Sequence, residues 1–152
     1  MGAPEGPIDY RAHPERYRIG RGEAGVFHVQ PYKGELLPLW TIRTPALARA
    51  SADAILDRFR AYREAGDFVG MDMARKYLQM GYTRARRYAN RRGGRKRAPD
   101  GTPLPAGTGD PAKAEVAAIY HAAWRAVAAD PDYQRAKAAH QQRSGGTRSD
   151  GE

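Results

Sequence analysis

Three places where a capping residue and a proline stand directly before a helical pattern constrain the fold most, because this pair marks the start of a helix. They are Thr44-Pro45, Asp110-Pro111 and Asp130-Pro131. After the first pair, small or apolar residues recur every three or four positions, which is typical of an amphipathic helix: Leu47, Ala48, Ser51, Ile55, Phe59 and Tyr62. Gly66 follows as a stop, so we predict a helix over residues 45–65.

A second apolar stripe follows at once. Its members are Val69, Met73, Tyr77 and Met80. Gly81 is a plausible helix end and Thr83 a plausible new cap, so we expect helical structure over residues 70–91 with a break near Gly81. The short helix after the break would place Arg84, Arg87 and Arg91 on one face.

Two more helices are predicted after the two later proline pairs. A clear stripe starts after Asp110 and comprises Val116, Ile119, Tyr120, Ala123, Trp124 and Val127. The helix after Asp130 is weaker and should end near Ala139. We therefore expect an Ala-rich helical extension over residues 110–140, a linker over 98–109, a flexible start over 1–8 and a disordered tail over 141–152.

Residues 9–43 have a different pattern. Residues 25–30 include β-branched and aromatic residues and are followed by Pro31, and residues 39–43 alternate in polarity. These runs predict a small N-terminal antiparallel sheet or hairpin packed on two to three helices. The expected fold is therefore α+β, with a core domain over residues 9–97.

The charge of the chain is concentrated in one segment. The chain has 26 basic and 17 acidic residues, a net charge of +9, yet no acidic residue lies between Asp72 and Asp100. Such a block attracts anions, so we predict binding of nucleic acid, DNA or RNA, through backbone phosphates with little sequence specificity. Arg84, Arg87 and Arg91 would make ordered contacts with the phosphates. A flexible arm would be formed by Arg92, Arg95, Lys96 and Arg97. The predicted binding residues are Arg75, Lys76, Arg84, Arg86, Arg87, Arg91, Arg92, Arg95, Lys96 and Arg97.

Two other hypotheses stay open. The chain could be a small enzyme acting on a phosphorylated or nucleic-acid substrate, with Glu23, Lys33, Asp72 and Arg75 converging as a catalytic set. It could also be a protein-interaction module whose helix 111–129 docks on a partner or on its own copy. The pattern G-x-G-x-x-G over residues 20–25 is interpreted as a glycine-permitted hairpin turn. A dinucleotide-binding motif needs a long helix after it, whereas only five strand-like residues separate Gly25 from Pro31.

The remaining composition argues for a cytoplasmic protein without metal or cofactor. The chain has no cysteine, and its four histidines lack metal-site spacing. We expect His28 on a strand face, and His121 and His140 in solvent. No apolar run is long enough to span a membrane.

Three motifs in the same order resemble those of a family of bacterial and phage proteins labelled domain of unknown function 4385. They are Gly20-Arg21-Gly22-Glu23-Ala24-Gly25-Val26, then Pro31-Tyr32-Lys33-Gly34-Glu35-Leu36-Leu37-Pro38-Leu39-Trp40, then residues 67–90, which begin Asp67-Phe68-Val69-Gly70-Met71-Asp72. The resemblance implies no reaction, and it implies that the helices after Asp110 lie outside the family core. It does imply that these residues belong to one motif set: Glu23, Lys33, Glu35, Asp72, Arg75, Lys76, Arg84 and Arg87.

Overall fold

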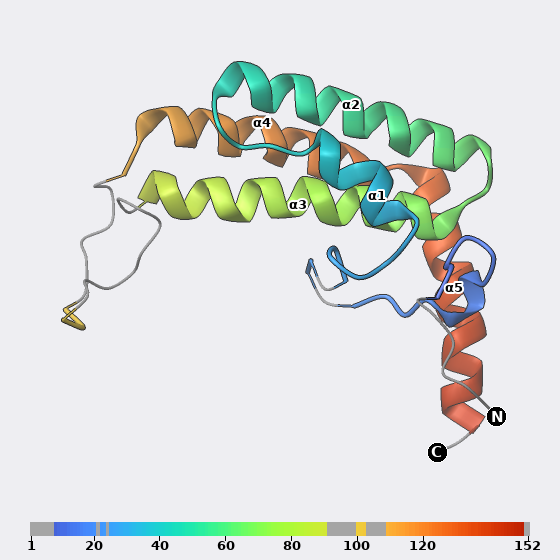
Figure 1. Ribbon diagram of the computed structural model, residues 1–152. Coiled ribbons are helices and arrows are strands. Elements are labelled where there is room, and N and C mark those ends of the chain that lie inside the picture. Colours follow the sequence, from blue (N-terminus) through green and yellow to red (C-terminus); the bar gives the residue numbers. More distant parts are fainter. Residues whose placement is uncertain (1–7, 21, 24, 91–99, 103–108, 151–152) are drawn as a thin grey trace.

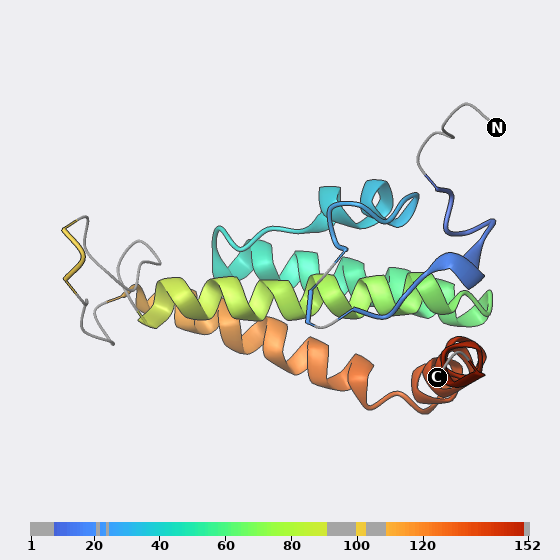
Figure 2. The same cartoon turned by 90° about the horizontal axis from the view of Figure 1, so that it is seen from below.

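The structure, a computed structural model, is a helical bundle (Figure 1). It describes residues 8–20, 22–23, 25–90, 100–102 and 109–150, with side chains to residue 143 in the last range. The three long helices α2 (Pro45–Glu64), α3 (Phe68–Asn90) and α4 (Pro111–Ala128) pack side by side, and α5 (Pro131–Asp150) runs crosswise at one end (Figures 1 and 2). Three short pieces precede them: η1 (Pro14–Arg16), α1 (Tyr32–Leu36) and η2 (Leu37–Leu39).

The predicted α+β fold is wrong, because the described residues contain no strand. Their single extended pairing is one isolated bridge between Asp9 and Gln30. Residues 25–29 form a tight turn instead, in which the Val29 amide donates to the Gly25 carbonyl at 3.1 Å. Val26, Val29, Tyr32 and Leu36 are all buried. Their spacing of three and four residues is typical of a helix. The strand prediction was wrong because it followed the β-branched composition and not this spacing.

The second predicted strand, residues 39–43, is also absent. Its carbonyl groups are used by side chains from other helices: Tyr120 donates to the Thr41 carbonyl at 2.8 Å, and Lys113 donates to the Ile42 carbonyl. The Trp40 indole in turn donates to the Tyr77 carbonyl at 3.0 Å. This segment is therefore irregular, and hydrogen bonds to α3 and α4 hold it against the bundle.

Helix α2 confirms the strongest prediction. The Thr44 hydroxyl accepts a hydrogen bond from the Leu47 amide at 3.1 Å, and Pro45 occupies the first turn. Gly66 follows the helix with φ +69°, a conformation that favours glycine.

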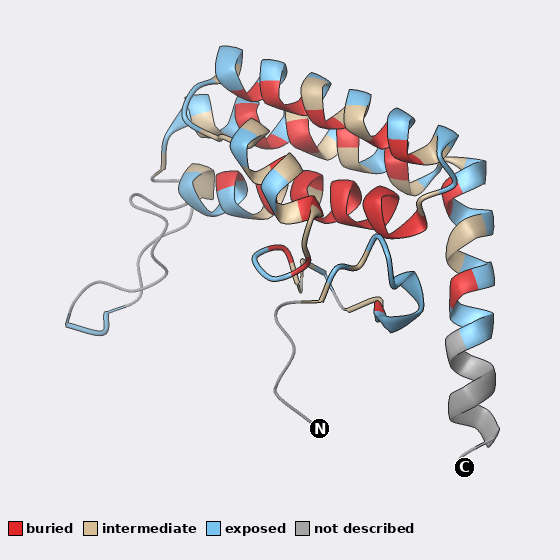
Figure 3. Ribbon diagram, turned by 45° about the vertical axis from the view of Figure 1, so that its right-hand side comes forward, coloured by how far each residue is buried: buried red, intermediate tan, exposed pale blue. Residues whose placement is uncertain are grey.

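Helix α3 is continuous through Gly81, so the predicted break is wrong. Gly81 allows α3 and α4 to pack closely, because a Cβ at this position would lie only 2.4 Å from the Tyr120 ring of α4. Gly70 does the same against the Tyr62 ring of α2, also at 2.4 Å. Both glycines let a neighbouring tyrosine lie directly on the α3 backbone, and α3 becomes the centre of the fold (Figure 3).

The last two helices start where the sequence predicts. The Asp110 carboxylate accepts from the Ala112 amide at 2.8 Å, and the Asp130 carboxylate accepts from the Tyr133 amide at 2.9 Å. Four residues of the α4 stripe, Val116, Tyr120, Ala123 and Val127, are buried in the bundle with α2 and α3, whereas Ile119 and Trp124 are half-buried. Helix α5 is longer than predicted and continues to Asp150, through residues where we expected disorder. Most of the predicted linker lies outside the described residues, and no described helix has the length and hydropathy of a membrane span.

Candidate nucleic-acid interface

The first half of α3 holds three charged side chains inside the protein. Asp72, Arg75 and Lys76 are 0%, 9% and 1% exposed. One turn of helix brings them together: Arg75 Nη2 lies 2.8 Å from Asp72 Oδ1, and Lys76 Nζ lies 3.9 Å from Asp72 Oδ2. We call these three residues the buried charge cluster.

Two tyrosines from distant parts of the chain complete the cluster. Tyr133 of α5 donates to Asp72 Oδ1 at 2.6 Å, and Tyr17 donates to Asp72 Oδ2 at 2.5 Å. Burial alone would raise the pKa of Asp72, but attraction to Arg75 and these two hydrogen bonds outweigh it and hold that pKa below its usual range. Asp72 is therefore an ionised carboxylate with its hydrogen bonds supplied.

The attraction of Asp72 does not fully offset the effect of burial on the charged form of Lys76. Burial lowers its pKa to about 8, and the nearby Arg75 adds to this, while Asp72 acts against it. Its ammonium group also lies 5.0 Å from the centre of the Tyr17 ring.

The glycine-rich motif covers this cluster. Arg75 Nη1 donates to the Gly22 carbonyl at 2.7 Å, and a Cβ on Gly25 would lie 3.8 Å from Lys76 Nζ. Gly22 and Gly25 both have positive φ, +54° and +93°. The described residues of the motif thus form a turn, as expected, but they lie on α3 and do not join two strands.

The structure brings together only half of the predicted catalytic set. Asp72 and Arg75 form an ion pair. Glu23 accepts instead from the Thr83 hydroxyl, and Lys33 lies half-buried on α1. Among the described residues, neither Glu23 nor Lys33 has a hydrogen bond or ion pair with Asp72 or Arg75.

The predicted nucleic-acid residues also divide in two. Arg75 and Lys76 are in the buried charge cluster, whereas Arg84, Arg86 and Arg87 are exposed on the second half of α3. None of these three forms an ion pair with a residue that the structure describes. We call them the arginine face. The other predicted residues, Arg91, Arg92, Arg95, Lys96 and Arg97, lie outside the described residues.

Aromatic side chains flank the arginine face on both sides. The guanidinium carbon of Arg84 lies 5.7 Å from the centre of the Phe27 ring, and that of Arg86 lies 5.7 Å from the centre of the Tyr82 ring. Phe27 and Tyr88 are each 40% exposed. Base–aromatic stacking is a common part of single-strand binding sites, so these rings are chemically suited to such a surface.

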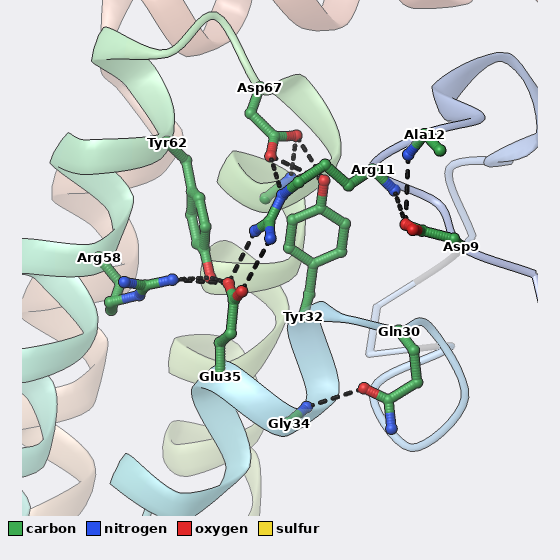
Figure 4. Close-up of polar contacts among 11 residues, drawn as sticks. Asp9, Arg11, Ala12, Gln30, Tyr32, Gly34, Glu35, Arg58, Tyr62 and Asp67 are labelled. Carbon is green, nitrogen blue, oxygen red and sulfur yellow. Dashed lines mark hydrogen bonds and ion pairs between the residues drawn. The ribbon is translucent and has the colours of Figure 1, made fainter.

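A second polar cluster, which the sequence did not predict, centres on Glu35 (Figure 4). Its carboxylate accepts from Arg11 at 2.8 and 2.9 Å, from Arg58 at 2.6 Å and from Tyr62 at 2.6 Å. Hydrogen bonding from Arg11 contributes most to lowering the pKa of Glu35 to about 2. Arg11 also reaches Asp67 at 3.5 Å. The cluster ties the N-terminal segment to α1 and α2, and it has equal numbers of basic and acidic groups.

His140 corrects another expectation. It is only 3% exposed, its Nε2 lies 2.6 Å from the Tyr17 carbonyl oxygen, and its ring centre lies 4.9 Å from that of Phe68. His28 is exposed but lies in a turn, and His121 packs at 4.8 Å from the Tyr82 ring. The described residues contain no group of three side chains suited to hold a metal ion.

The chain matches the family described as domain of unknown function (DUF4385) over residues 2–143, which confirms the resemblance. The match includes α4 and α5 as far as residue 143, as well as the segments with the three motifs, so the expectation that the helices after Asp110 lie outside the family core is wrong. No curated protein and no solved structure matches the chain.

Proposed function

The chain belongs to the DUF4385 family, whose description names no activity, and we propose that it binds nucleic acid through the arginine face of α3. The observation that carries this proposal is the separation of basic residues along one helix. The inner pair, Arg75 and Lys76, shares a counter-charge, whereas Arg84, Arg86 and Arg87 are exposed and have none among the described residues.

An arginine without an acidic neighbour can give its full charge to a ligand. Its planar group donates two parallel hydrogen bonds to phosphate, which lysine cannot do. Phosphate contacts of this kind give affinity without reading base sequence. The arginines also share one helix, where successive residues rise 1.5 Å, so the spacing of their Cα atoms is set before a ligand binds. A cytoplasmic location fits the same proposal.

The test is equilibrium binding by fluorescence anisotropy, with labelled DNA and RNA in single- and double-stranded form. We expect the triple variant Arg84→Ala/Arg86→Ala/Arg87→Ala to bind at least about tenfold more weakly than the wild type at low salt, because it loses three phosphate contacts. The matched control is Arg16→Ala/Arg43→Ala/Arg49→Ala. It removes the same charge from exposed arginines elsewhere that also lack an ion pair with a described residue.

Equal losses in both triple variants would show that only net charge matters and would overturn the assignment to α3. The absence of binding to all four probes at about 50 mM salt would overturn the function itself, since phosphate contacts are strongest at low salt.

A further inference from the structure

A groove lies beside the arginine face, between the end of α3 and the start of α4. Its volume is about 490 Å³, within the range of about 300–1,000 Å³ that small-molecule sites have. Its lining includes Tyr82, Arg86 and Asn90 from α3, and Ala114, Ala118 and His121 from α4.

One wall of the groove is aromatic and held by its neighbours. The Tyr82 ring centre lies 4.8 Å from that of His121 and 5.7 Å from that of Trp124. Arg86 donates a hydrogen bond from Nη1 to the Tyr82 hydroxyl at 2.5 Å. Tyr82 is therefore fixed in place on two sides, so a planar ligand that stacks on it would meet a wall that is already formed.

The α4 part of the lining includes small residues, and two polar side chains of α3 also line the groove. Ala114 and Ala118 lie one turn apart on α4 and leave room that larger side chains would fill. Arg86 and Asn90, also one turn apart, supply a cation and an amide that can donate and accept hydrogen bonds. A flat apolar ring with polar edges, next to a phosphate, is the ligand that this combination fits.

We propose that the groove takes one unstacked nucleobase while Arg86 and the rest of the arginine face hold the adjoining phosphates. The proposal rests on the proposed function and makes it specific: the preferred ligand is single-stranded nucleic acid. In a duplex every base is stacked and paired, so moving one base into the groove costs free energy for unpairing and unstacking. This cost is smallest for a base that is already single-stranded. Stacking on an aromatic ring is tolerant of sequence, which agrees with binding that reads no sequence.

The first experiment uses Trp124 as a reporter, because its ring borders the Tyr82 wall. Trp40 is changed to Phe so that tryptophan emission comes from Trp124 alone. We expect a single-stranded dT oligonucleotide of about 20 nucleotides to quench this emission in a saturable way, and the corresponding duplex to bind more weakly and quench less.

Two variants then test the groove itself. Tyr82→Ala should weaken single-strand binding by about 5- to 150-fold, the effect that one stacked base contributes. Ala118→Leu should weaken it by filling the groove without removing any polar group. Their controls are Leu47→Ala, an exposed apolar residue on α2 that does not line the groove, and Ala122→Leu, an exposed alanine on α4 that does not line it either. Both controls should bind as the wild type does.

The outcomes separate this inference from the proposed function. Equal affinity for single strands and duplexes, with Tyr82→Ala and Ala118→Leu both at wild-type affinity, would overturn the base site and leave phosphate binding intact. A loss in Ala118→Leu with normal circular dichroism supports the groove even if Tyr82→Ala proves unstable. Failure of the arginine-face triple variant to weaken binding would overturn the proposed function whatever the groove variants do.

Discussion

The two halves of α3 carry the same kinds of residue in opposite environments. Lys76 and Arg87 are eleven positions apart, three helical turns, and therefore face the same side of the helix. Over the first half, Tyr17 and the turn at Gly22 cover this side, and the basic residues there are buried with Asp72 as their counter-charge. Over the second half the arginines remain exposed. Whether other segments of the chain cover a basic residue, and not its residue type, therefore decides whether it stabilises the fold or is available to a ligand.

The largest expected effect comes from removing the counter-charge. Asp72→Asn removes the anion that Arg75 and Lys76 share in the buried charge cluster and weakens the hydrogen bonds of Tyr17 and Tyr133. We expect the free energy of unfolding in urea to fall by about 3–5 kcal/mol, the usual cost of breaking a buried ion pair.

The control for this change is Asp53→Asn, which alters an exposed carboxylate on α2 and should change stability by less than about 0.5 kcal/mol. A loss below about 1 kcal/mol in Asp72→Asn would mean that the buried charge cluster does not depend on its anion.

The next effect lies at Gly81, within the continuous helix that joins the two halves. Gly81→Ala gains helix propensity, but its Cβ would overlap the Tyr120 ring at 2.4 Å. Overpacking should dominate and lower the unfolding free energy by about 1–3 kcal/mol. Gly34→Ala on α1, where a Cβ meets only the Gln30 side chain at 3.4 Å, should be neutral or slightly stabilising. Stabilisation by Gly81→Ala would contradict the packing described here.

A smaller effect should appear at alkaline pH. Burial lowers the pKa of Lys76 to about 8, below its value of about 10.4 in an unfolded chain. Between these values the unfolded chain holds more protons, so stability rises with pH, by about 1–2 kcal/mol from about pH 8 to 9.5. Above about pH 10 the raised pKa of buried Tyr17 works in the opposite direction.

Urea unfolding at several pH values measures this rise. It should vanish in Lys76→Met and persist in Lys137→Met, which changes a half-buried lysine on α5. An identical rise in Lys76→Met would assign the pH dependence to another group.

The smallest effect on stability should come from the arginine face. Arg84→Ala, Arg86→Ala and Arg87→Ala should each change the free energy of unfolding by less than about 0.5 kcal/mol, because exposed side chains without an ion pair contribute little. Urea midpoints check this directly. A loss above about 2 kcal/mol for the triple variant would mean that the two halves of α3 do not differ as described.

The sequence predicted those helices whose start and buried side are determined by residues within or next to the helix itself. The caps at Thr44, Asp110 and Asp130 and the stripes that follow them were enough to predict α2, α4 and the start of α5. Residues 25–43 were misread because β-branched composition outweighed the helical spacing of Val26, Val29, Tyr32 and Leu36, and because side chains of α3 and α4 determine where this segment lies.

The site was predictable to a similar degree. Clustering of charge identified the segment with the exposed arginines, but not which of its residues are buried. One local sign was present: Asp72 lies three and four positions before Arg75 and Lys76, the spacing of helical ion pairs. The cover from Tyr17 and Tyr133 could not be seen, because these residues are 55 and 61 positions from Asp72. The Glu35 cluster was missed for the same reason.

The central claim, that the arginine face binds phosphates, is tested most directly by the salt dependence of binding. Anisotropy with a single-stranded oligonucleotide from about 50 to 200 mM salt gives the slope of log affinity against log salt, about −0.7 for each phosphate contact. We predict that the arginine-face triple variant has a slope flatter by about 2 than the wild type, while Arg16→Ala/Arg43→Ala/Arg49→Ala keeps the wild-type slope. Equal slopes for the wild type and the arginine-face variant would contradict the claim.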